Sequence, residues 1–311
     1  MKQNIFLALG LWAVLILGYF FLAREHLPTG ATVALAVLGG TFTAVFIGAV
    51  RGFISSRADG RLIEAAVAGW GLADQKQVAV VGRIHATKAP LRSPTGDVPC
   101  VAYEYEVSRL VERDNRSDDS SDTKPQKVVD ASGLGMVDCH ITGASGTVRL
   151  SGFPLLEAFG DRTSTDRDSF QRLIRHVTAH PPAQVSFASK LKAVKEMSSA
   201  LTQENTSMIA NWQLTKKELG SSGQSIAEKV VAVDSEVVAL GFYDASKGAL
   251  VARSGWKASF NRLYPGTAPE VIRIMSGKAR TGLIIASALF LVFHAFLFFI
   301  LSRAPEHGVM S

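Results

Sequence analysis

Two histidines in this sequence are spaced so that both could bind one metal ion. His176 and His180 stand four residues apart in a segment with helical periodicity, so they face one side of a helix, as zinc ligands do. Val177 stands where a zinc protease needs a Glu base, and no third ligand is indicated. His180 also lies next to the helix end, where an imidazole suits the negative end of the helix dipole. We therefore interpret both histidines as structural and expect no metal and no cofactor.

The other reactive side chains form no catalytic pattern. Cys139 and His140 are neighbours on a predicted strand, and neighbouring side chains on a strand point to opposite faces. Glu104 and Glu106 share a strand face and could be an acid and base pair, but nothing places a nucleophile or metal opposite them, so we interpret them as solubilising. No nucleophile elbow, phosphate-binding loop or dinucleotide-binding motif occurs. The net charge of +6 contains no dense Lys/Arg block, which argues against a nucleic-acid partner.

Three apolar segments account for the high mean hydropathy of this 311-residue chain, which is +0.19 with only 19% charged residues. They predict transmembrane helices at residues 4–22, 31–50 and 281–301, each long enough to cross a ~30 Å hydrocarbon core. The first could instead be a secretory signal, but its apolar length and the lack of small residues at its end favour an uncleaved span. A short connector centred on Pro28 predicts that the first two spans form a hairpin.

The distribution of positive charge predicts the orientation of these spans. Lys and Arg next to membrane helices are retained on the cytoplasmic side. Seven such residues lie on one side (Lys2, Arg51, Arg57, Arg61, Arg273, Lys278 and Arg280) and two on the other (Arg24 and Arg303). We expect a multi-pass protein of a bacterial inner membrane, or of an organelle membrane, with a cytoplasmic soluble region and the C-terminus outside. Two cysteines fit a reducing compartment, although they would also suffice for one disulfide.

Residues 51–277 are predicted to form one soluble domain, so the fold class is an α+β membrane protein with a mostly antiparallel, barrel-like β domain. A helix bearing Leu62 and Trp70 opens it, either at the membrane surface or packed on the domain. A flexible loop is expected at 113–127, and a helical insert at 168–210 contains one helix capped by Asp168 and a second at 186–210. The predicted strands cover residues 78–85, 101–108, 136–141, 147–150, 212–219, 229–233, 236–243 and 249–252.

The stretch around residues 74–105 resembles the opening of the GIDE domain, also called the beside-a-membrane (BAM) domain. The family's best-known members are mitochondrial membrane-anchored E3 ubiquitin ligases. The resemblance is carried by a strand with a glycine, a P-L-x-S-P turn, a further glycine, a cysteine and an aromatic-rich strand. Its residues are Gly82, Pro90, Leu91, Ser93, Pro94, Gly96, Cys100 and Tyr103.

The resemblance implies a fold and a membrane placement without catalytic residues, because the zinc-binding RING of the ligases is missing here. Cys100 could be a nucleophile, but a thiol at a strand start with no His beside it is typical of a small buried hydrophobe. We therefore predict a non-catalytic module that binds the lipid surface or an unknown protein partner. The alternative is an enzyme, either a ubiquitin-type transferase by kinship or a membrane-linked hydrolase.

Small residues recur every four positions along the second predicted span, at Ala36, Gly40, Ala44 and Gly48. Such a stripe lets two helix backbones approach closely within a bilayer. We predict that it faces a neighbouring helix. That neighbour is the first span, the third span or the same helix of a second copy in a homo-oligomer, and the sequence leaves the three open.

Overall fold

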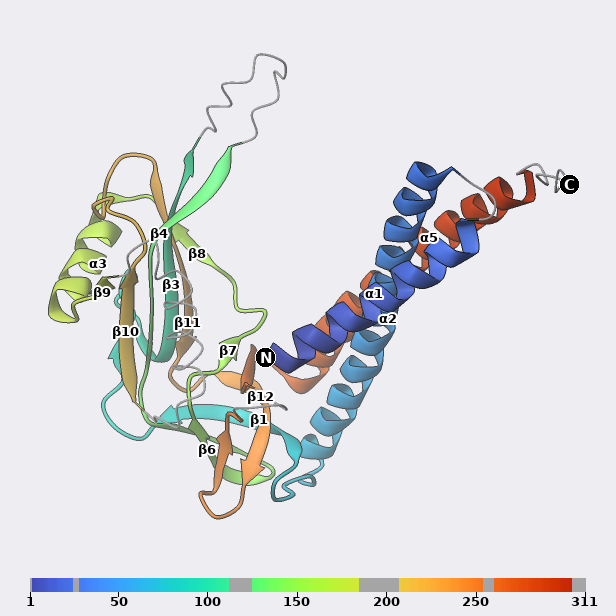
Figure 1. Ribbon diagram of the computed structural model, residues 1–311. Coiled ribbons are helices and arrows are strands. Elements are labelled where there is room, and N and C mark those ends of the chain that lie inside the picture. The colour runs from blue at the N-terminus through green and yellow to red at the C-terminus, as the bar shows by residue number, and fades with distance from the viewer. Residues whose placement is uncertain (1, 25–27, 112–124, 185–206, 254–259, 304–311) are drawn as a thin grey trace, which may run out of the picture. The chain divides into compact units, whose positions relative to one another are not determined.

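The computed structural model describes residues 2–24, 28–111, 125–184, 207–253 and 260–303, and the chain divides into two compact units (Figure 1). The helix unit comprises residues 1–61 and 272–311, and the β unit comprises residues 62–271. The molecule is thus a mixed α+β protein, as the sequence predicts. The second helix of the expected insert lies mostly outside the described residues, as does most of the expected flexible loop.

Three helices make up most of the helix unit: α1 (Lys2–Ala23), α2 (Thr29–Val67) and α5 (Ala268–Arg303). Among the described residues, α2 and α5 are long and apolar enough to cross a membrane. The corresponding apolar stretch of α1, Trp12–Phe21, is shorter. Two candidate membrane helices are therefore established, and the role of α1 as a third span stays a prediction.

The helix that follows the second predicted span differs from expectation. Instead of a separate helix bearing Trp70, α2 runs without a break to Val67. The helix ends there because Gly69 and Gly71 adopt positive φ angles of 77° and 114°, which are unfavourable for other residues. Trp70 lies beyond the helix end and is 75% exposed, so it shares no helix face with Leu62.

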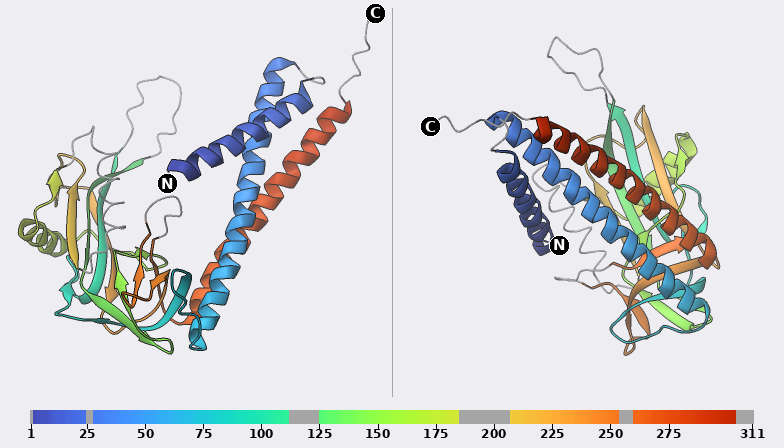
Figure 2. Two further views of the ribbon diagram at one scale, coloured as in Figure 1. Left: turned by 60° about the horizontal axis from the view of Figure 1, so that its bottom comes forward. Right: turned by 90° about the vertical axis from the view of Figure 1, so that its right-hand side faces the viewer.

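In both views of Figure 2, α2 and α5 run close to each other, and in the left view α1 crosses α2. Part of the small-residue stripe of α2 meets α1: a Cβ atom on Gly40 would lie 2.7 Å from Ile16 Cγ1. The neighbouring Gly39 leaves room for the Tyr19 ring, and Ala36 is buried. Gly48 has nothing within 4 Å, and Ala44 is half-buried.

A polar cluster in the apolar helices joins α1, α2 and α5. The Tyr19 hydroxyl lies 2.5 Å from His294 Nε2 and 2.8 Å from Thr43 Oγ1. His294 Nδ1 lies 2.7 Å from the Phe290 carbonyl, which can only accept, so Nδ1 donates, and in a neutral ring Nε2 then accepts from the Tyr19 hydroxyl. Next to it, the rings of Phe46 and Phe290 stack 4.7 Å apart. A polar group in an apolar helix needs a partner, and each helix here supplies one.

One sheet of the β unit closes on itself. It contains β1 (Gln77–Ala86), β5 (Cys139–Gly143), β6 (Gly146–Ser151), β7 (Leu155–Leu156), β12 (Glu236–Asp244), β13 (Ala249–Val251) and β14 (Arg262–Pro265). β1 pairs with both β5 and β12, and β5–β6–β13–β12 complete the ring. The expected barrel-like sheet is confirmed as a ring of five paired strands, to which β14 and β7 are added at one side. A Cβ on Gly82 would lie 2.1 Å from the Thr142 carbonyl oxygen, so the β1–β5 crossing requires glycine.

The second sheet runs in the order β8-β11-β3-β4-β10-β9, with β2 on β3. Its strands are β2 (Leu91–Arg92), β3 (Pro99–Val111), β4 (Gln126–Met136), β8 (Arg162–Ser164), β9 (Ala183–Gln184), β10 (Met208–Gln213) and β11 (Gln224–Ala232). One face shares a core with the barrel, through Val101, Met136 and Val231. The helix α3 (Arg167–Ala179) covers the other face, packing Phe170 and Leu173 against Tyr103 and Tyr105.

Three details of the predicted elements are wrong. β4 was not anticipated: it begins at Gln126, inside the loop expected at 113–127, and ends at Met136, which was predicted to begin the strand at 136–141. Residues 208–210 belong to β10 and not to the end of a helix, so that strand begins four residues before its expected start at Trp212. The cap of α3 is Asp166, whose Oδ1 accepts the Ser169 amide at 2.8 Å, and Asp168 lies inside the first turn.

The contact between α1 and α2 predicts opposite outcomes for two glycines of the same stripe. Gly40→Leu should force Ile16 away and loosen the pair by about 1–3 kcal/mol, the range for overpacking a close contact. Cysteines placed at Trp12 and Thr41, whose Nε1 and Oγ1 atoms lie 3.3 Å apart, measure the pairing through the yield of a short bifunctional thiol crosslinker in native membranes. Gly48→Leu is the matched control and should leave the yield unchanged. Equal yields in the two variants would contradict the packing role of Gly40.

Candidate functional site

Six of the eight family-like residues lie in a compact turn, which we call the motif turn (residues 90–100), whereas Gly82 lies in β1 and Tyr103 in β3. The Ser93 amide donates to the Val98 carbonyl at 2.9 Å, the Val98 amide donates to Ser93 Oγ at 3.3 Å, and the Asp97 amide donates to the Ser93 carbonyl. The left-handed residue is Asp97, at φ 53°, and not Gly96. Gly96 instead lets the Ser93 side chain pack closely against the backbone, since a Cβ there would lie 3.2 Å from Ser93 Oγ. Ser93 and Thr95 are almost completely buried.

A buried carboxylate holds the motif turn on the sheet. Glu228 of β11 is 0% exposed, and its Oε1 accepts the backbone amide of Thr95 at 2.9 Å. Its second oxygen, Oε2, has no hydrogen-bond partner among the described residues. A buried carboxylate is costly without hydrogen bonds, so Glu228 and the motif turn depend on each other.

An arginine of α3 holds the motif turn from the other side. Arg172 Nε donates to the Thr95 carbonyl, and its Nη2 donates to Ser169 Oγ at 3.1 Å. Asp166 fixes the start of α3, since it accepts from both the amide and the hydroxyl of Ser169. Both backbone groups of Thr95 are therefore bonded to side chains from distant parts of the sequence.

The two cysteines are placed for packing. Cys100 and Cys139 are each 0% exposed. Burial raises the pKa of the Cys100 thiol to about 12, with the nearby Glu228 charge adding to the rise. Burial likewise raises the pKa of Cys139 to about 12. A thiol is nucleophilic as the thiolate, so neither cysteine is activated at neutral pH.

A hydrogen bond between Tyr103 and His176 links the sheet to α3. The Tyr103 hydroxyl lies 2.9 Å from His176 Nε2, and burial raises the pKa of the fully buried Tyr103. Burial, together with the neighbouring His180, lowers the pKa of His176 to about 4, so the ring is neutral at pH 7. His180 donates its amide to the His176 carbonyl at the helix end. Both histidines therefore have protein partners, as the structural interpretation requires.

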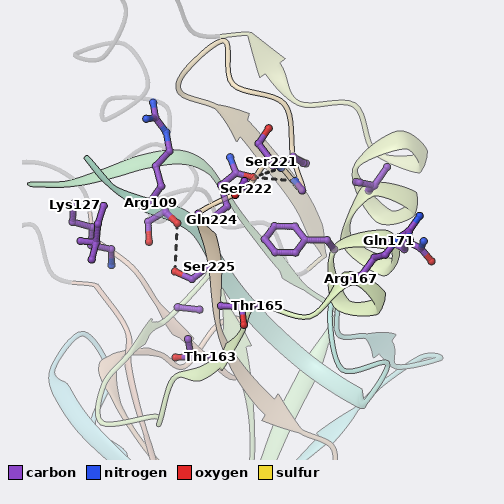
Figure 3. A pocket seen from close by; sticks show the side chains of 18 of the residues that line it. Arg109, Lys127, Thr163, Thr165, Arg167, Gln171, Ser221, Ser222, Gln224 and Ser225 are labelled. Carbon is purple, nitrogen blue, oxygen red and sulfur yellow. Dashed lines mark hydrogen bonds between the residues drawn. The ribbon is translucent and has the colours of Figure 1, made fainter. Parts of the chain in front are cut away.

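Two hollows flank these residues. The smaller, which we call the arginine pocket, has a volume of about 380 Å³ and is lined by Arg92, Ser93, Pro94, Asp97, Arg172, Arg175 and His176. The larger, which we call the groove, has a volume of about 1120 Å³ and lies between α3, β3, β8 and the turn before β11 (Figure 3). The groove mixes hydroxyl groups of Thr163, Thr165 and Ser225 with apolar side chains, of which Leu110 is 68% and Ile174 is 40% exposed.

A hydrogen-bond network around Asp130 supports one wall of the groove. Gln224 Oε1 accepts the amides of Gly220 and Ser221, and its Nε2 donates to Asp130 Oδ2 at 2.8 Å. Arg109 Nε bonds both oxygens of Asp130 at 3.1 and 3.2 Å, and Thr215 donates to Oδ1. Burial would raise the pKa of Asp130, but these hydrogen bonds outweigh it and hold the pKa below its usual value. The wall is therefore fixed before any ligand binds.

The paired glutamates of β3 are engaged in ion pairs. Glu104 contacts Lys229 Nζ at 2.6 Å, and Glu106 contacts Lys127 Nζ at 2.6 Å. No group of three metal-ligating side chains occurs within the described ranges. Sequence reasoning missed Glu228 and Arg172, which are distant in sequence from the motif turn. Glu228 directly precedes the strand predicted at 229–233 and is followed by Lys229, a pattern that fits a solvent-facing position.

Comparisons of the chain with protein-family models, with curated proteins and with solved structures gave no match. The resemblance to the GIDE domain therefore rests on the residues of the motif turn and the strands beside it.

The environment of His176 predicts a pH-dependent stability. Between pH 6.5 and about 4 the unfolded chain binds a proton at this residue while the folded chain does not, so stability falls as the pH falls through this range. After a discount for partial solvation, we expect a loss of about 1 kcal/mol between pH 7 and 5 that His176→Gln removes. Thermal unfolding of both proteins at several pH values in detergent measures it. Parallel pH curves would show that His176 titrates normally in the folded state.

Proposed function

We propose that the chain is a membrane-anchored, GIDE-like module that binds a protein partner without catalysing a reaction on it. The observation that carries this proposal is that the reactive thiols of the β unit are buried, whereas its accessible side chains are unreactive. The two thiols are buried with raised pKa values, whereas the groove presents apolar and hydroxyl side chains on fixed walls. Concave sites that combine apolar side chains with a few hydrogen-bonding groups are typical of ligand binding.

The membrane part of the proposal rests on the apolar helices. α2 and α5 are long enough to span a bilayer, and the Tyr19–His294 hydrogen bond would tie α1 to them as a third span. With the excess of Lys and Arg next to the β unit, the positive-inside rule favours a cytoplasmic β unit and an external C-terminus. Reporters fused after Gly60 and after Ser311 should give cytoplasmic and exported signals respectively, and an exported signal at Gly60 would contradict this orientation.

The groove favours a polypeptide over the membrane surface as the occupant. A lipid surface attracts a convex face rich in unpaired cations. Three cations line the groove. Arg109 and Lys127 are paired with Asp130 and Glu106, and the charge of Arg167 is balanced in number by Asp161, which also lines the groove. The exposed Leu110 and Ile174 instead offer apolar contacts inside a concavity, which suits side chains of a protein ligand.

Site-specific photocrosslinking in native membranes tests the proposed function. A photoreactive residue at Ile174 or Leu110 should give the same discrete protein adduct. The same group at Ser246, an exposed turn residue outside the groove, should not. Ile174→Arg should abolish the adduct formed from position 110. Adducts with lipid alone would contradict the protein partner, and identical adducts at all three positions would contradict a specific groove.

A further inference from the structure

The arginine pocket has more positive charge than its own residues neutralise. Three guanidinium groups and a single carboxylate line it. Arg92 Nη1 lies 3.3 Å from Asp97 Oδ2 and 3.1 Å from the Asp97 carbonyl, so these two residues pair with each other. Arg172 and Arg175 form no ion pair with a carboxylate within the described part of the chain, although the Asp166 charge acts on Arg172 from the start of α3. Among the residues that line the pocket itself, about two positive charges are left over.

The positions of these charges are fixed by other parts of the structure. Arg172 is held through Nε by the Thr95 carbonyl and through Nη2 by Ser169, which leaves its other N–H groups for the pocket. Arg175 follows three residues later on α3 and therefore lies on the same helix face. His176, neutral at pH 7 and bonded to Tyr103, adds no charge to the wall.

We propose that the arginine pocket binds the phosphate group of a phosphomonoester, either a free solute or a lipid headgroup. A phosphomonoester carries close to two negative charges at pH 7, which matches the surplus of the pocket. Its oxygens accept the parallel N–H bonds of a guanidinium group, and two arginines on one helix face offer such bonds from neighbouring positions. The hollow of about 380 Å³ is large enough for the group and its ester oxygen.

The pocket binds its anion whether or not the groove binds a protein, since Arg172 and Arg175 do not line the groove. Failure of the proposed function and failure of this proposal are therefore distinguishable. Loss of the protein adduct at Ile174 addresses the groove, and phosphate titration addresses the arginine pocket.

Isothermal titration of the full chain in maltoside micelles with inorganic phosphate tests the site. We expect saturable binding below about 10 mM phosphate, weakened roughly tenfold or more by Arg175→Gln. Arg175 has no partner in the described part of the chain, so this variant should fold normally. Arg83→Gln is the matched control: it removes the same charge from an exposed arginine on β1 and should bind phosphate as the parent does.

A second variant separates guanidinium geometry from charge. Arg172→Lys keeps the charge but loses the planar fork, so we expect phosphate binding to weaken severalfold while the net charge is unchanged. Because Arg172 also holds Thr95, the melting temperature is measured alongside. If the turn loosens in that variant, the Arg175→Gln result decides alone.

Nanodiscs distinguish the two sources of the phosphate group. If a lipid headgroup fills the pocket, nanodiscs containing phosphatidic acid should weaken the binding of free phosphate relative to nanodiscs containing phosphatidylglycerol, an anionic phosphodiester that also repels free phosphate. If a free solute is the ligand, both lipid compositions should give the same affinity. Absence of saturable phosphate binding by the parent, or equal affinities for Arg175→Gln and Arg83→Gln, would overturn the proposal.

Discussion

The buried carboxylate of Glu228 is the interaction on which the organisation of the β unit depends. It bonds the Thr95 amide from within the sheet, while Arg172 bonds the Thr95 carbonyl from α3. The motif turn is thereby held between β11 and the helix. Its position in turn buries Cys100 and creates the hollow lined by Arg172 and Arg175. Burying the Glu228 carboxylate costs free energy, and the hydrogen bond from the Thr95 amide offsets this cost only while the motif turn stays in place.

The helix α3 covers one face of the sheet beneath the motif turn, which explains the aromatic side of β3, while Glu104 and Glu106 on the other side of the strand stay partly exposed. Tyr103 and Tyr105 of β3 lie over Gly135 and Gly133 of β4, where a Cβ would come within 2.4 Å of each ring. The tyrosine hydroxyls reach His176 and Asn211 at 2.9 Å. Asn211 also donates to the His180 carbonyl, so β10 and the end of α3 are joined through the same residue. The aromatic strand thus positions α3, and α3 positions the arginines.

Much of the fold was predictable because its strands follow simple patterns. The alternation in β3 and the β-branched run of β1 identified these strands, and the apolar spacing of Phe170, Leu173 and Val177 identified α3. β4 was not predictable in this way, because Gly133 and Gly135 stand where apolar side chains would complete its pattern. Their place is taken by tyrosine rings from β3, a relation between strands that no local window contains.

The candidate site was only partly predictable for the same reason. The motif residues from Pro90 to Tyr103 were identified from their sequence, but the side chains that hold them, Glu228 and Arg172, are 133 and 77 residues from Thr95. In the helix unit, the stripe containing Gly40 was visible, whereas the bond between Tyr19 and His294, 275 residues apart, was not. Long-range polar contacts such as these leave no periodic signal in a sequence.

Hydrogen exchange at the Thr95 amide tests the central role of Glu228 most directly. In the full chain this amide should be protected, and Glu228→Leu should accelerate its exchange by about tenfold or more because the acceptor is removed. The Ala239 amide in the barrel strand β12 should exchange at an unchanged rate. Unchanged protection of Thr95 in the variant would show that the motif turn is held without Glu228 and would contradict this account.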